Sequence, residues 1–365
     1  MKIGIDASRA FIEKKTGTEE YSYRLIKNLT LLDTSGHQIF LYIRNKDKID
    51  FNLPENFFVK EIKKNRLWTQ FGLSKEMKKN PVDVLFVPSH SVPFIHPSKT
   101  VATVHGLEYK HHPESYFWKE RIKLEFNTLI SVKWAKKIIV PSESTKRDVM
   151  KFYKIDADKI KVVYHGVEST KYQVLSIKQQ DKKYFTFLYI GRLEKRKNLV
   201  NLIKAFELFR KRHYIMSSAK KGYKLILAGK EGFGFEEINS AIQQSPYKDD
   251  IIVKSYVPES EKEELYQKAS VFVLISLYEG FGLPILEAMS HGVPVICSNV
   301  SSIPEIAGEA GLLVNPIDIE EIAIEFEKII CNQDLKNDMI EKGYENVKKF
   351  SWEKCAKETL DVLLN

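Results

Sequence analysis

An apolar run, two glycines and a proline in the second half of the chain constrain its fold more than any other feature. Residues 269–275 are rich in Val, Phe and Ile, which predicts a buried strand of a parallel sheet. Gly280 and Gly282 follow, and glycine lets a backbone turn tightly and approach a ligand. Pro284 suits the first turn of a helix, which we expect over residues 283–290. Free N–H groups at a helix start attract phosphate, so this stretch predicts an anion site.

Two carboxylates accompany this turn. Glu279 precedes it, and Glu287 lies on the expected helix, so the two side chains could flank one ligand. Taken singly, each is more often a solvated surface residue, and strand–glycine–helix turns are common in α/β proteins. The combination of both carboxylates with the intervening Gly-Phe-Gly-Leu-Pro resembles the donor-site motif of the retaining glycosyltransferases of family 4.

A pair of cations follows an earlier strand, expected over residues 184–190. Arg192 and Lys197 flank the turn into a helix, where the helix dipole is unfavourable for positive charge. A dianionic group bound between them would explain both, since a charge-assisted hydrogen bond contributes about 1.5–3 kcal/mol. The pattern Gly-Arg-Leu, three residues, Lys-Asn also resembles the family, in which this Arg and Lys hold the donor diphosphate. Lys195 and Arg196 match nothing in that pattern, and we expect them to be solvated.

The first half begins as nucleotide-binding folds do. A strand at residues 2–6 leads to a polar loop at 14–20 and then to a helix with one apolar face. There is no Gly-x-Gly-x-x-Gly, which argues against a dinucleotide dehydrogenase. In the family this first loop closes over the donor pyrophosphate, so the resemblance makes Gly17 and Thr18 candidate backbone contacts. An ordinary surface loop would explain the sequence equally well.

His105 ends a strand expected over residues 100–105, at the edge where open α/β sheets bind ligands. A lone histidine is more often structural. In the family a histidine at this place contacts the donor sugar and is typically followed by Asp, whereas Gly106 follows here. This departure keeps His105 as a candidate but puts in doubt how its loop is held. By the same resemblance, Val257 lies against the nucleobase.

The resemblance assigns a role to each of these residues. Arg192 and Lys197 would neutralise the leaving diphosphate, aided by N–H groups near Gly282, while Glu279 binds the donor sugar and Glu287 the ribose. With cations in place, no metal and no cofactor is expected. The candidate donor-binding residues are Gly17, Thr18, Arg192, Lys197, Val257, Glu279, Gly280, Phe281, Gly282, Leu283 and Glu287, and the candidate catalytic residues are His105, Glu279, Arg192 and Lys197.

Positive charge is concentrated in the first half of the chain. Residues 1–170 hold 30 Lys and Arg against 20 Asp and Glu, while the remainder holds 27 against 28. A basic half could meet nucleic acid, an anionic membrane surface or an acidic substrate, and a Lys-rich compositional bias would also raise the count. No nucleic-acid-binding module is evident, so we expect no such partner. Residues 63–79 interleave aromatic and basic residues, which suits either a helix on a headgroup layer or a core-covering helix with snorkelling lysines.

The length of 365 residues suits two domains. The polar, aperiodic residues 168–183 predict a linker. We expect an α/β protein of the GT-B class, with two facing Rossmann-like domains built on parallel sheets. Residues 1–170 form the acceptor-binding domain, 171–348 the donor-binding domain, and the helix of 349–365 crosses back onto the first domain, as the resemblance implies. No apolar run is long enough to span a bilayer, no signal peptide is recognised and three cysteines are widely spaced, so we expect a cytoplasmic protein. The basic first half would suit a lipid-linked acceptor, with the protein in peripheral contact with the cytoplasmic face of the membrane.

The resemblance implies transfer of a sugar from a nucleotide diphosphate sugar to a hydroxyl of a glycan or lipid-linked acceptor, with retained anomeric configuration. The segments around Trp68 and His105 resemble polysaccharide mannosyltransferases, so GDP-mannose is the first expectation and a UDP-sugar the second. A GT-B epimerase, a phosphorylase and a non-catalytic partner subunit are the rival readings. Gly106 keeps the last of these open.

Overall fold

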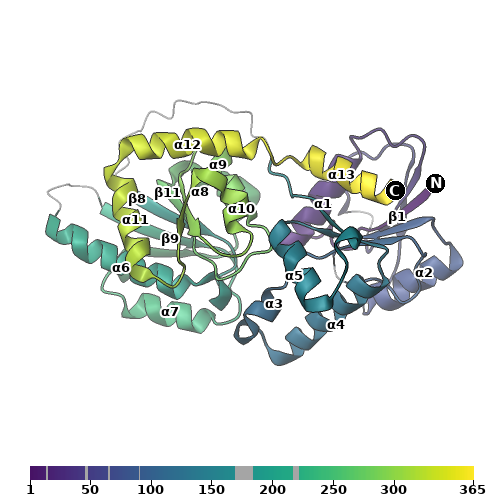
Figure 1. The fold of residues 1–365 in the computed structure, drawn as a ribbon, viewed down its shortest axis with the longest axis horizontal. Coiled ribbons are helices and arrows are strands. Elements are labelled where there is room, and N and C mark those ends of the chain that lie inside the picture. Colours follow the sequence, from purple (N-terminus) through teal and green to yellow (C-terminus); the bar gives the residue numbers. More distant parts are fainter. Residues whose placement is uncertain (14, 46–47, 65, 90, 169–183, 217–221) are drawn as a thin grey trace. The chain divides into compact units, whose positions relative to one another are not determined.

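The structure, a computed structural model, describes residues 1–13, 15–45, 48–64, 66–89, 91–168, 184–216 and 222–365. They form two compact units (Figure 1). Unit 1 holds Met1–Leu107, Trp118–Gly166 and Phe350–Asn365, and unit 2 holds Glu108–Phe117 and Val167–Lys349. The domain boundary expected at 170/171, and the expected linker beyond Glu168, lie outside the described residues, so that boundary stays a prediction.

Unit 1 is built on a parallel sheet in the order β3-β2-β1-β4-β5-β6-β7. All four residues of its central strand β4 are buried, so both faces of the sheet are covered. The strands are β1 Lys2–Asp6, β2 Gln38–Ile43, β3 Phe57–Glu61, β4 Val84–Val87, β5 Thr100–Thr103, β6 Lys137–Val140 and β7 Ile160–Val162. The helices are α1 Gly17–Leu29, α2 Ser74–Lys79, α4 Trp118–Trp134, α5 Glu143–Tyr153 and α13 Trp352–Leu364.

Unit 2 repeats this topology with a parallel sheet in the order β10-β9-β8-β11-β12-β13. Its core is aromatic, and the rings of Phe187 and Phe326 lie 4.4 Å apart. The strands are β8 Tyr184–Ile190, β9 Gly222–Ala228, β10 Ile251–Lys254, β11 Val271–Leu274, β12 Val295–Ser298 and β13 Gly311–Val314. The helices are α3 Glu108–His111, α6 Leu199–Met216, α7 Phe235–Gln244, α8 Glu259–Lys268, α9 Leu283–Ser290, α10 Ile303–Ala307, α11 Ile319–Cys331 and α12 Gln333–Val347.

Two local predictions were wrong because helices start earlier than expected. Residues 14–20 are not a loop throughout, since α1 begins at Gly17; the backbone N–H of Thr16 donates to the Glu19 carboxylate at 3.2 Å, which closes a capping box. The sequence Ser260-Glu261-Lys262-Glu263 predicts a helix with Ser260 as N-cap and Glu263 as its capping-box partner. That helix starts at Glu259 with Pro258 as its N-cap, because the fixed φ of proline suits a helix start.

Trp68 lies in the core of unit 1. Its side chain is buried, and its indole N–H donates to the Ile62 carbonyl at 3.1 Å. Of the two readings of residues 63–79, the core-covering one therefore holds for Trp68. None of the helices in the described part of the chain is long and apolar enough to cross a bilayer.

The last helix belongs to unit 1. α13 packs on α1, and its first residue, Trp352, stacks on the His165 ring with centroids 5.9 Å apart. The neighbouring Gly166 leaves room for this contact, since a Cβ at Gly166 would lie 2.0 Å from the backbone nitrogen of Trp352. The junction between β7 and α13 thus depends on a missing side chain.

We expect Gly166→Ala to lower the free energy of unfolding of unit 1 by about 1–3 kcal/mol, because backbone must move to admit the methyl group. Urea denaturation followed by circular dichroism measures the loss. Gly36→Ala is the matched control, since a Cβ there meets nothing within 4 Å and should change stability by no more than about 0.5 kcal/mol. Equal stability of the two variants would contradict the predicted clash.

Candidate functional site

The predicted anion site of unit 2 lies where the strand order of its sheet reverses. β8 and β11 are neighbours. After β8 the chain forms β9 on one side of this pair, and after β11 it forms β12 on the other side. Open α/β sheets bind ligands at the carboxyl ends of the strands at such a point. Residues 191–198 follow β8, and residues 275–282 follow β11. The predicted helix is confirmed as α9, with Gly282 as its N-cap at φ 108° and Pro284 in its first turn.

Two serines hold the turn between β11 and α9. The backbone N–H of Glu279 donates to Oγ of Ser301 at 2.9 Å. Oγ of Ser302 lies 2.9 Å from the Glu279 carbonyl oxygen and 2.8 Å from that of Phe281. These hydroxyls fix the backbone that carries Glu279. Sequence reasoning missed them, because nothing near Ser301 in the sequence points to a turn more than twenty residues earlier.

Glu279 is an ionised carboxylate held between two cations. Its Oε1 lies 2.5 Å from Nζ of Lys197, and its Oε2 lies 3.6 Å from Nη1 of Arg196. Burial by itself raises the pKa of Glu279, but Lys197 and then Arg196 outweigh it, so the pKa is lowered. The carboxylate therefore keeps its charge well below neutral pH.

Arg196 was predicted to be solvated, and this was wrong. Its side chain is buried, with Nη1 donating to the Tyr278 carbonyl at 2.6 Å and Nη2 to Oε1 of Glu194 at 2.7 Å. Burial alone lowers the pKa of a guanidinium, but the nearby carboxylates of Glu279, Glu108 and Glu194 raise the pKa of Arg196 overall. Arg196 is thus the central cation of the site.

The cations predicted to hold a diphosphate have carboxylate partners in the structure. Nε of Arg192 lies 3.4 Å from Oε2 of Glu194, and the Arg192 side chain is about half exposed. Lys197 is paired with Glu279 as described above. The ion pairs of this cluster join three cations, Arg192, Arg196 and Lys197, to two carboxylates, Glu194 and Glu279. The arginine is open to a ligand, whereas the lysine must exchange its partner to bind one.

A short segment outside the predicted site also reaches this cluster. Within unit 2, the ring of His111 stacks on that of Tyr278, with centroids 4.8 Å apart and planes 25° from parallel. Tyr116 and Glu108 lie close enough to act on the pKa of Arg196. The sequence assigned these residues to the first domain, and no signal in it marked them as neighbours of Glu279.

The remaining donor-site candidates of unit 2 occupy α9 and the end of β10. Glu287 accepts a hydrogen bond from the Tyr266 hydroxyl at 2.8 Å, and Nζ of Lys262 lies 3.8 Å away. Val257 follows β10 and is buried, while its neighbour Tyr256 is exposed. Among the other candidates, Gly280, Phe281 and Gly282 are buried in the turn, and Leu283 begins α9.

Three candidates belong to unit 1. Nε2 of His105 lies 2.7 Å from the Pro88 carbonyl oxygen, which can only accept, so Nε2 carries the proton. Burial lowers the pKa of His105 to about 4, so the imidazole is neutral at pH 7. Gly17 and Thr18 stand in the first turn of α1, and Gly17 faces open space, with nothing within 4 Å of the position of a Cβ.

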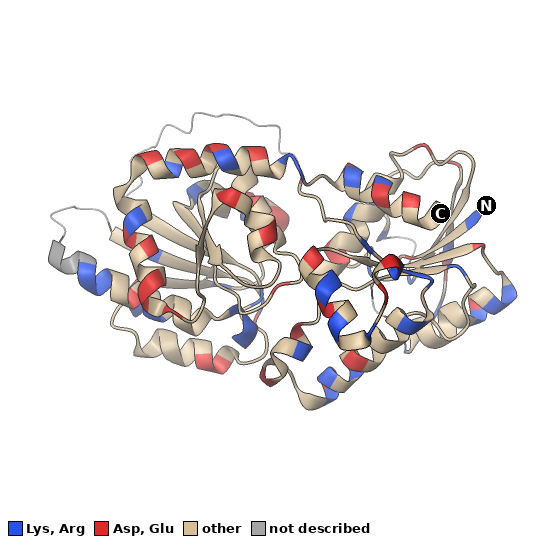
Figure 2. Cartoon of the chain, viewed as in Figure 1, with Lys and Arg blue, Asp and Glu red and all other residues tan. Residues whose placement is uncertain are grey.

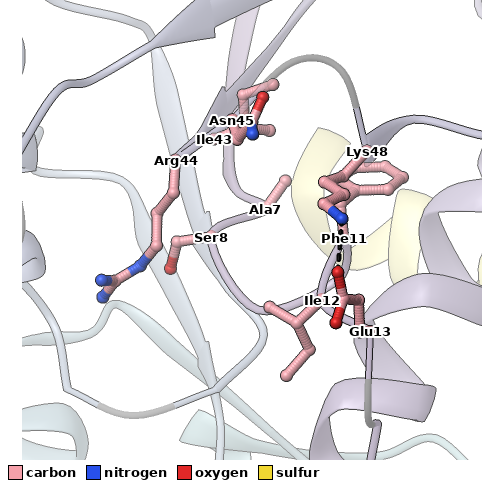
Figure 3. Close-up of a pocket in the computed structure, with 9 residues that line it drawn as sticks. All are labelled: Ala7, Ser8, Phe11, Ile12, Glu13, Ile43, Arg44, Asn45 and Lys48. Carbon is pink, nitrogen blue, oxygen red and sulfur yellow. Dashed lines mark hydrogen bonds and ion pairs between the residues drawn. The ribbon is translucent and has the colours of Figure 1, made fainter.

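Unit 1 also contains a cavity of about 260 Å³ at the carboxyl ends of β1 and β2 (Figure 3). Arg44 and Ser8 line one side, and the ion pair between Lys48 and Glu13, at 2.6 Å, lines another. Burial lowers the pKa of Arg44, and no described residue forms an ion pair with its guanidinium. The cavity combines polar groups with apolar walls that include Phe11.

No group of three His, Cys, Asp or Glu side chains is arranged to hold a metal ion in the part of the chain that the structure describes. The sequence does contain an Asp-x-Asp tripeptide at Asp156 and Asp158, which sequence reasoning passed over. Both aspartates are exposed in the turn before β7.

Known proteins resemble this chain over nearly its whole length. The family model described as Glycosyltransferase Family 4 matches residues 16–171, and that described as Glycosyl transferases group 1 matches residues 174–346. The O-antigen chain mannosyltransferase B of Escherichia coli is 32% identical over 272 residues, which are 72% of this chain and 70% of that protein. The O-antigen chain mannosyltransferase RfbU of Salmonella typhimurium is 28% identical over 230 residues, 63% and 60% of the two chains.

A solved structure with the same fold contains a nucleotide. The crystal structure of Anabaena HepE in complex with UDP and glucose matches with a TM-score of 0.72 at 15% identity, covering 100% of this chain and 99% of that one. This likeness, together with the two parallel sheets, confirms the predicted α/β fold of the GT-B class.

We expect Arg196→Met to lower the free energy of unfolding of unit 2 by about 3–5 kcal/mol at pH 7, because it removes the buried cation that Glu279 and Glu194 share and leaves each carboxylate with one partner. The loss should shrink as the pH falls toward 5. Without Arg196 the pKa of Glu279 rises, so the variant gains protons on folding where the wild type does not. Urea denaturation at a series of pH values measures both effects.

Lys195→Met is the matched control for this experiment. Lys195 lies next to Arg196 but is partly exposed and pairs with the exposed Glu237 at 2.9 Å. Its loss should cost no more than about 1 kcal/mol, with little dependence on pH. A pH-independent loss in the Arg196 variant would contradict the role given to Glu279.

Proposed function

Because the chain belongs to the family 4 glycosyltransferases, we propose that it transfers mannose from GDP-mannose to a hydroxyl of a glycan or lipid-linked acceptor in polysaccharide biosynthesis. The cluster of Arg192, Arg196 and Lys197 around the ionised Glu279, beside the start of α9, carries this proposal. The two O-antigen mannosyltransferases support mannose as the sugar. A UDP-sugar is the alternative donor, favoured by the HepE complex with UDP and glucose.

In this proposal, binding of the donor exchanges partners within the cluster. The diphosphate takes Lys197 from Glu279 and also binds Arg192, whose side chain is open to solvent. Glu279 is thereby released to accept hydrogen bonds from the hydroxyls of the sugar. Its lowered pKa keeps it ionised for that purpose. Arg196 stays in place and holds the carboxylate next to the reacting centre.

The other donor contacts follow the same scheme. The N–H of Leu283 at the start of α9, and the N–H groups of Gly17 and Thr18 at the start of α1, donate to phosphate. Glu287 binds the ribose, and Val257 lies against the base. In the turn before α9, Gly280, Phe281 and Gly282 bring the backbone close to the sugar.

His105 acts on the sugar as a neutral hydrogen-bond acceptor. Its Nε2 proton is engaged by the Pro88 carbonyl, which leaves Nδ1 as an acceptor at pH 7. Because Nδ1 carries no proton at pH 7, a sugar hydroxyl can donate a hydrogen bond to it. Gly106, which stands where the family typically has Asp, does not remove this hydrogen bond.

The reaction proceeds with retention. The bond from the anomeric carbon to the diphosphate breaks, and the acceptor oxygen attacks the same face of the sugar. The leaving phosphate oxygen takes the proton of the acceptor hydroxyl, so the products are a mannoside and GDP. Arg192 and Lys197 stabilise the charge that develops on the diphosphate, so the reaction requires neither a metal ion nor a cofactor.

The acceptor binds unit 1, the basic part of the chain. The cavity at the ends of β1 and β2 offers Arg44 and a hydroxyl among apolar walls, a lining that suits a sugar ring bearing an anionic group. Since a lipid-linked acceptor stays at a bilayer, the protein meets the membrane peripherally.

We expect GDP to stabilise the protein in a thermal-shift panel of GDP, UDP, ADP and CDP in the presence of EDTA. At one hundred times the dissociation constant the gain is about 2.7 kcal/mol. Arg192→Ala should raise the dissociation constant about tenfold or more, since a charge-assisted bond is lost. Lys195→Ala, in the same loop, should bind as the wild type does. Stabilisation by UDP alone would exclude GDP-mannose and favour a UDP-sugar as the donor. No response to any nucleotide would favour a non-catalytic subunit.

The second expectation concerns stereochemistry. With GDP-α-mannose and a synthetic alcohol or glycan acceptor, proton NMR of the first-formed product should show an α-mannoside. The rate should be the same with and without EDTA. A β-mannoside would exclude retention, and loss of turnover in EDTA that magnesium restores would exclude a metal-independent reaction.

A further inference from the structure

Exposed apolar side chains form a stripe along one face of α4. Trp118, Ile122 and Phe126 are 63%, 57% and 54% exposed. Residues four apart lie on the same side of a helix, so these three form a continuous ridge just over two turns long. A helix of a globular unit normally turns its largest apolar residues toward the core. This stripe, which we call the α4 stripe, is therefore a candidate contact surface.

A second group of exposed aromatic residues lies at the other end of the same helix. Trp134 is the last residue of α4, and its ring lies 6.0 Å from that of Phe94. Phe94 in turn lies 6.4 Å from Phe71, and all three side chains are substantially exposed. Both ends of α4 thus present aromatic rings to solvent, from residues that belong to unit 1.

Cations accompany these apolar side chains. Lys119, Arg121 and Lys123 are exposed on the same turns as the α4 stripe, and Figure 2 shows the basic residues on this helix. The Lys119 amine lies 5.4 Å from the centre of the Trp118 ring. At the other end of α4, the Lys64 amine lies 5.4 Å from the centre of the Phe71 ring. Amines this close to aromatic rings make cation–π contacts. Lysine stems can also cover apolar surface while the charged group stays in water or among headgroups.

Acidic groups do not balance this charge. Glu125, on the same helix, is partly buried and accepts a hydrogen bond from the Tyr153 hydroxyl at 3.2 Å. Glu120 is exposed, so the first turns of α4 carry three exposed cations against one exposed carboxylate. The surface is therefore apolar and also attracts anions.

We propose that α4 is the surface by which the protein docks on an anionic lipid bilayer, with Trp118, Ile122 and Phe126 inserted between headgroups and Lys119, Arg121 and Lys123 among the phosphates. The proposal extends the proposed function, since a lipid-linked acceptor is presented at such a bilayer. It also moves the membrane contact from residues 63–79, where Trp68 is buried, to α4.

Charge and shape favour a bilayer over a protein partner. Trp and Phe with Lys and Arg on one helix is the composition of interfacial helices, whose apolar face enters the headgroup boundary. The stripe is a ridge on a single helix, so it needs a partner that deforms around it. Anionic lipid does so, and it also neutralises the three cations, each of which contributes to binding at such a surface.

Vesicle flotation tests this with phosphatidylcholine alone and phosphatidylcholine mixed with phosphatidylglycerol. The wild type should bind the anionic vesicles, and binding should weaken with salt. Replacing Trp118, Ile122 and Phe126 together by Ser should lower the partition coefficient about tenfold or more. Replacing Lys119, Arg121 and Lys123 together by Ser should lower it about a hundredfold on anionic vesicles.

Matched controls separate α4 from the general properties of the surface. The apolar control replaces Leu31, Ile317 and Ile324 by Ser, and the charge control replaces Lys75, Lys78 and Lys79 by Ser. All six are exposed, and the lysines belong to the segment 63–79. Both controls should bind vesicles as the wild type does. Every variant should keep the thermal midpoint of the wild type, because the replaced side chains are solvent-exposed.

Bromine-labelled lipid adds a spectroscopic readout. It should quench the tryptophan fluorescence of the wild type, and less so that of Trp118→Phe, which keeps an apolar ring at that position. Equal quenching of the two proteins would overturn the insertion of Trp118. Vesicle binding that persists in both α4 variants would overturn the docking surface. An equal loss of vesicle binding in the control variants would overturn it as well.

Two further measurements distinguish the alternatives. A dimer in the absence of lipid that the apolar α4 variant converts to monomers, without vesicle binding by the wild type, would overturn the proposal in favour of a second copy of the chain. Nucleotide binding by the α4 variants should equal that of the wild type. Vesicle binding through α4 without any nucleotide response would support the docking surface and refute the proposed function, so the two can fail separately.

Discussion

A guanidinium removed from water is the constraint on which the loops of unit 2 depend. Arg196 is buried, and a buried cation is stable only where carboxylates and carbonyls surround it. Glu194 supplies one partner from its own loop, while Glu279 and the Tyr278 carbonyl come from the loop after β11. One side chain therefore fixes the spacing of two loops. The loops that carry Arg192 and Glu279 are thus held together before a ligand arrives, which lowers the cost of binding.

Much of the fold could be predicted because its signals are local. Short apolar runs marked the buried strands, and Gly282 with Pro284 marked the start of α9. The candidate site residues of unit 2 were proposed from spacing and resemblance, and in the structure Nζ of Lys197 lies 2.5 Å from Oε1 of Glu279. Their roles toward a donor stay predictions.

What the sequence could not predict depends on distant contacts. Arg196 looked like a surface residue because its partners in the β11 loop are 82 positions away. The stacking of His111 on Tyr278 left no local pattern either. Local signals also misled. Ser260 begins a good capping pattern, but the helix starts at Glu259 with Pro258 as its N-cap. The sequence of α4 did not show which of its apolar residues face water.

The return of α13 to unit 1 has a consequence for biosynthesis. A ribosome makes residues 1–166 first, but the part of α1 that α13 covers has no partner until residues 350–365 emerge. Unit 2 can finish folding while unit 1 is still incomplete, although unit 1 was started earlier. During that interval the face of α1 that α13 will cover is exposed, and the chain must not aggregate through it. The rate at which unit 2 is translated thus sets how long unit 1 stays without α13.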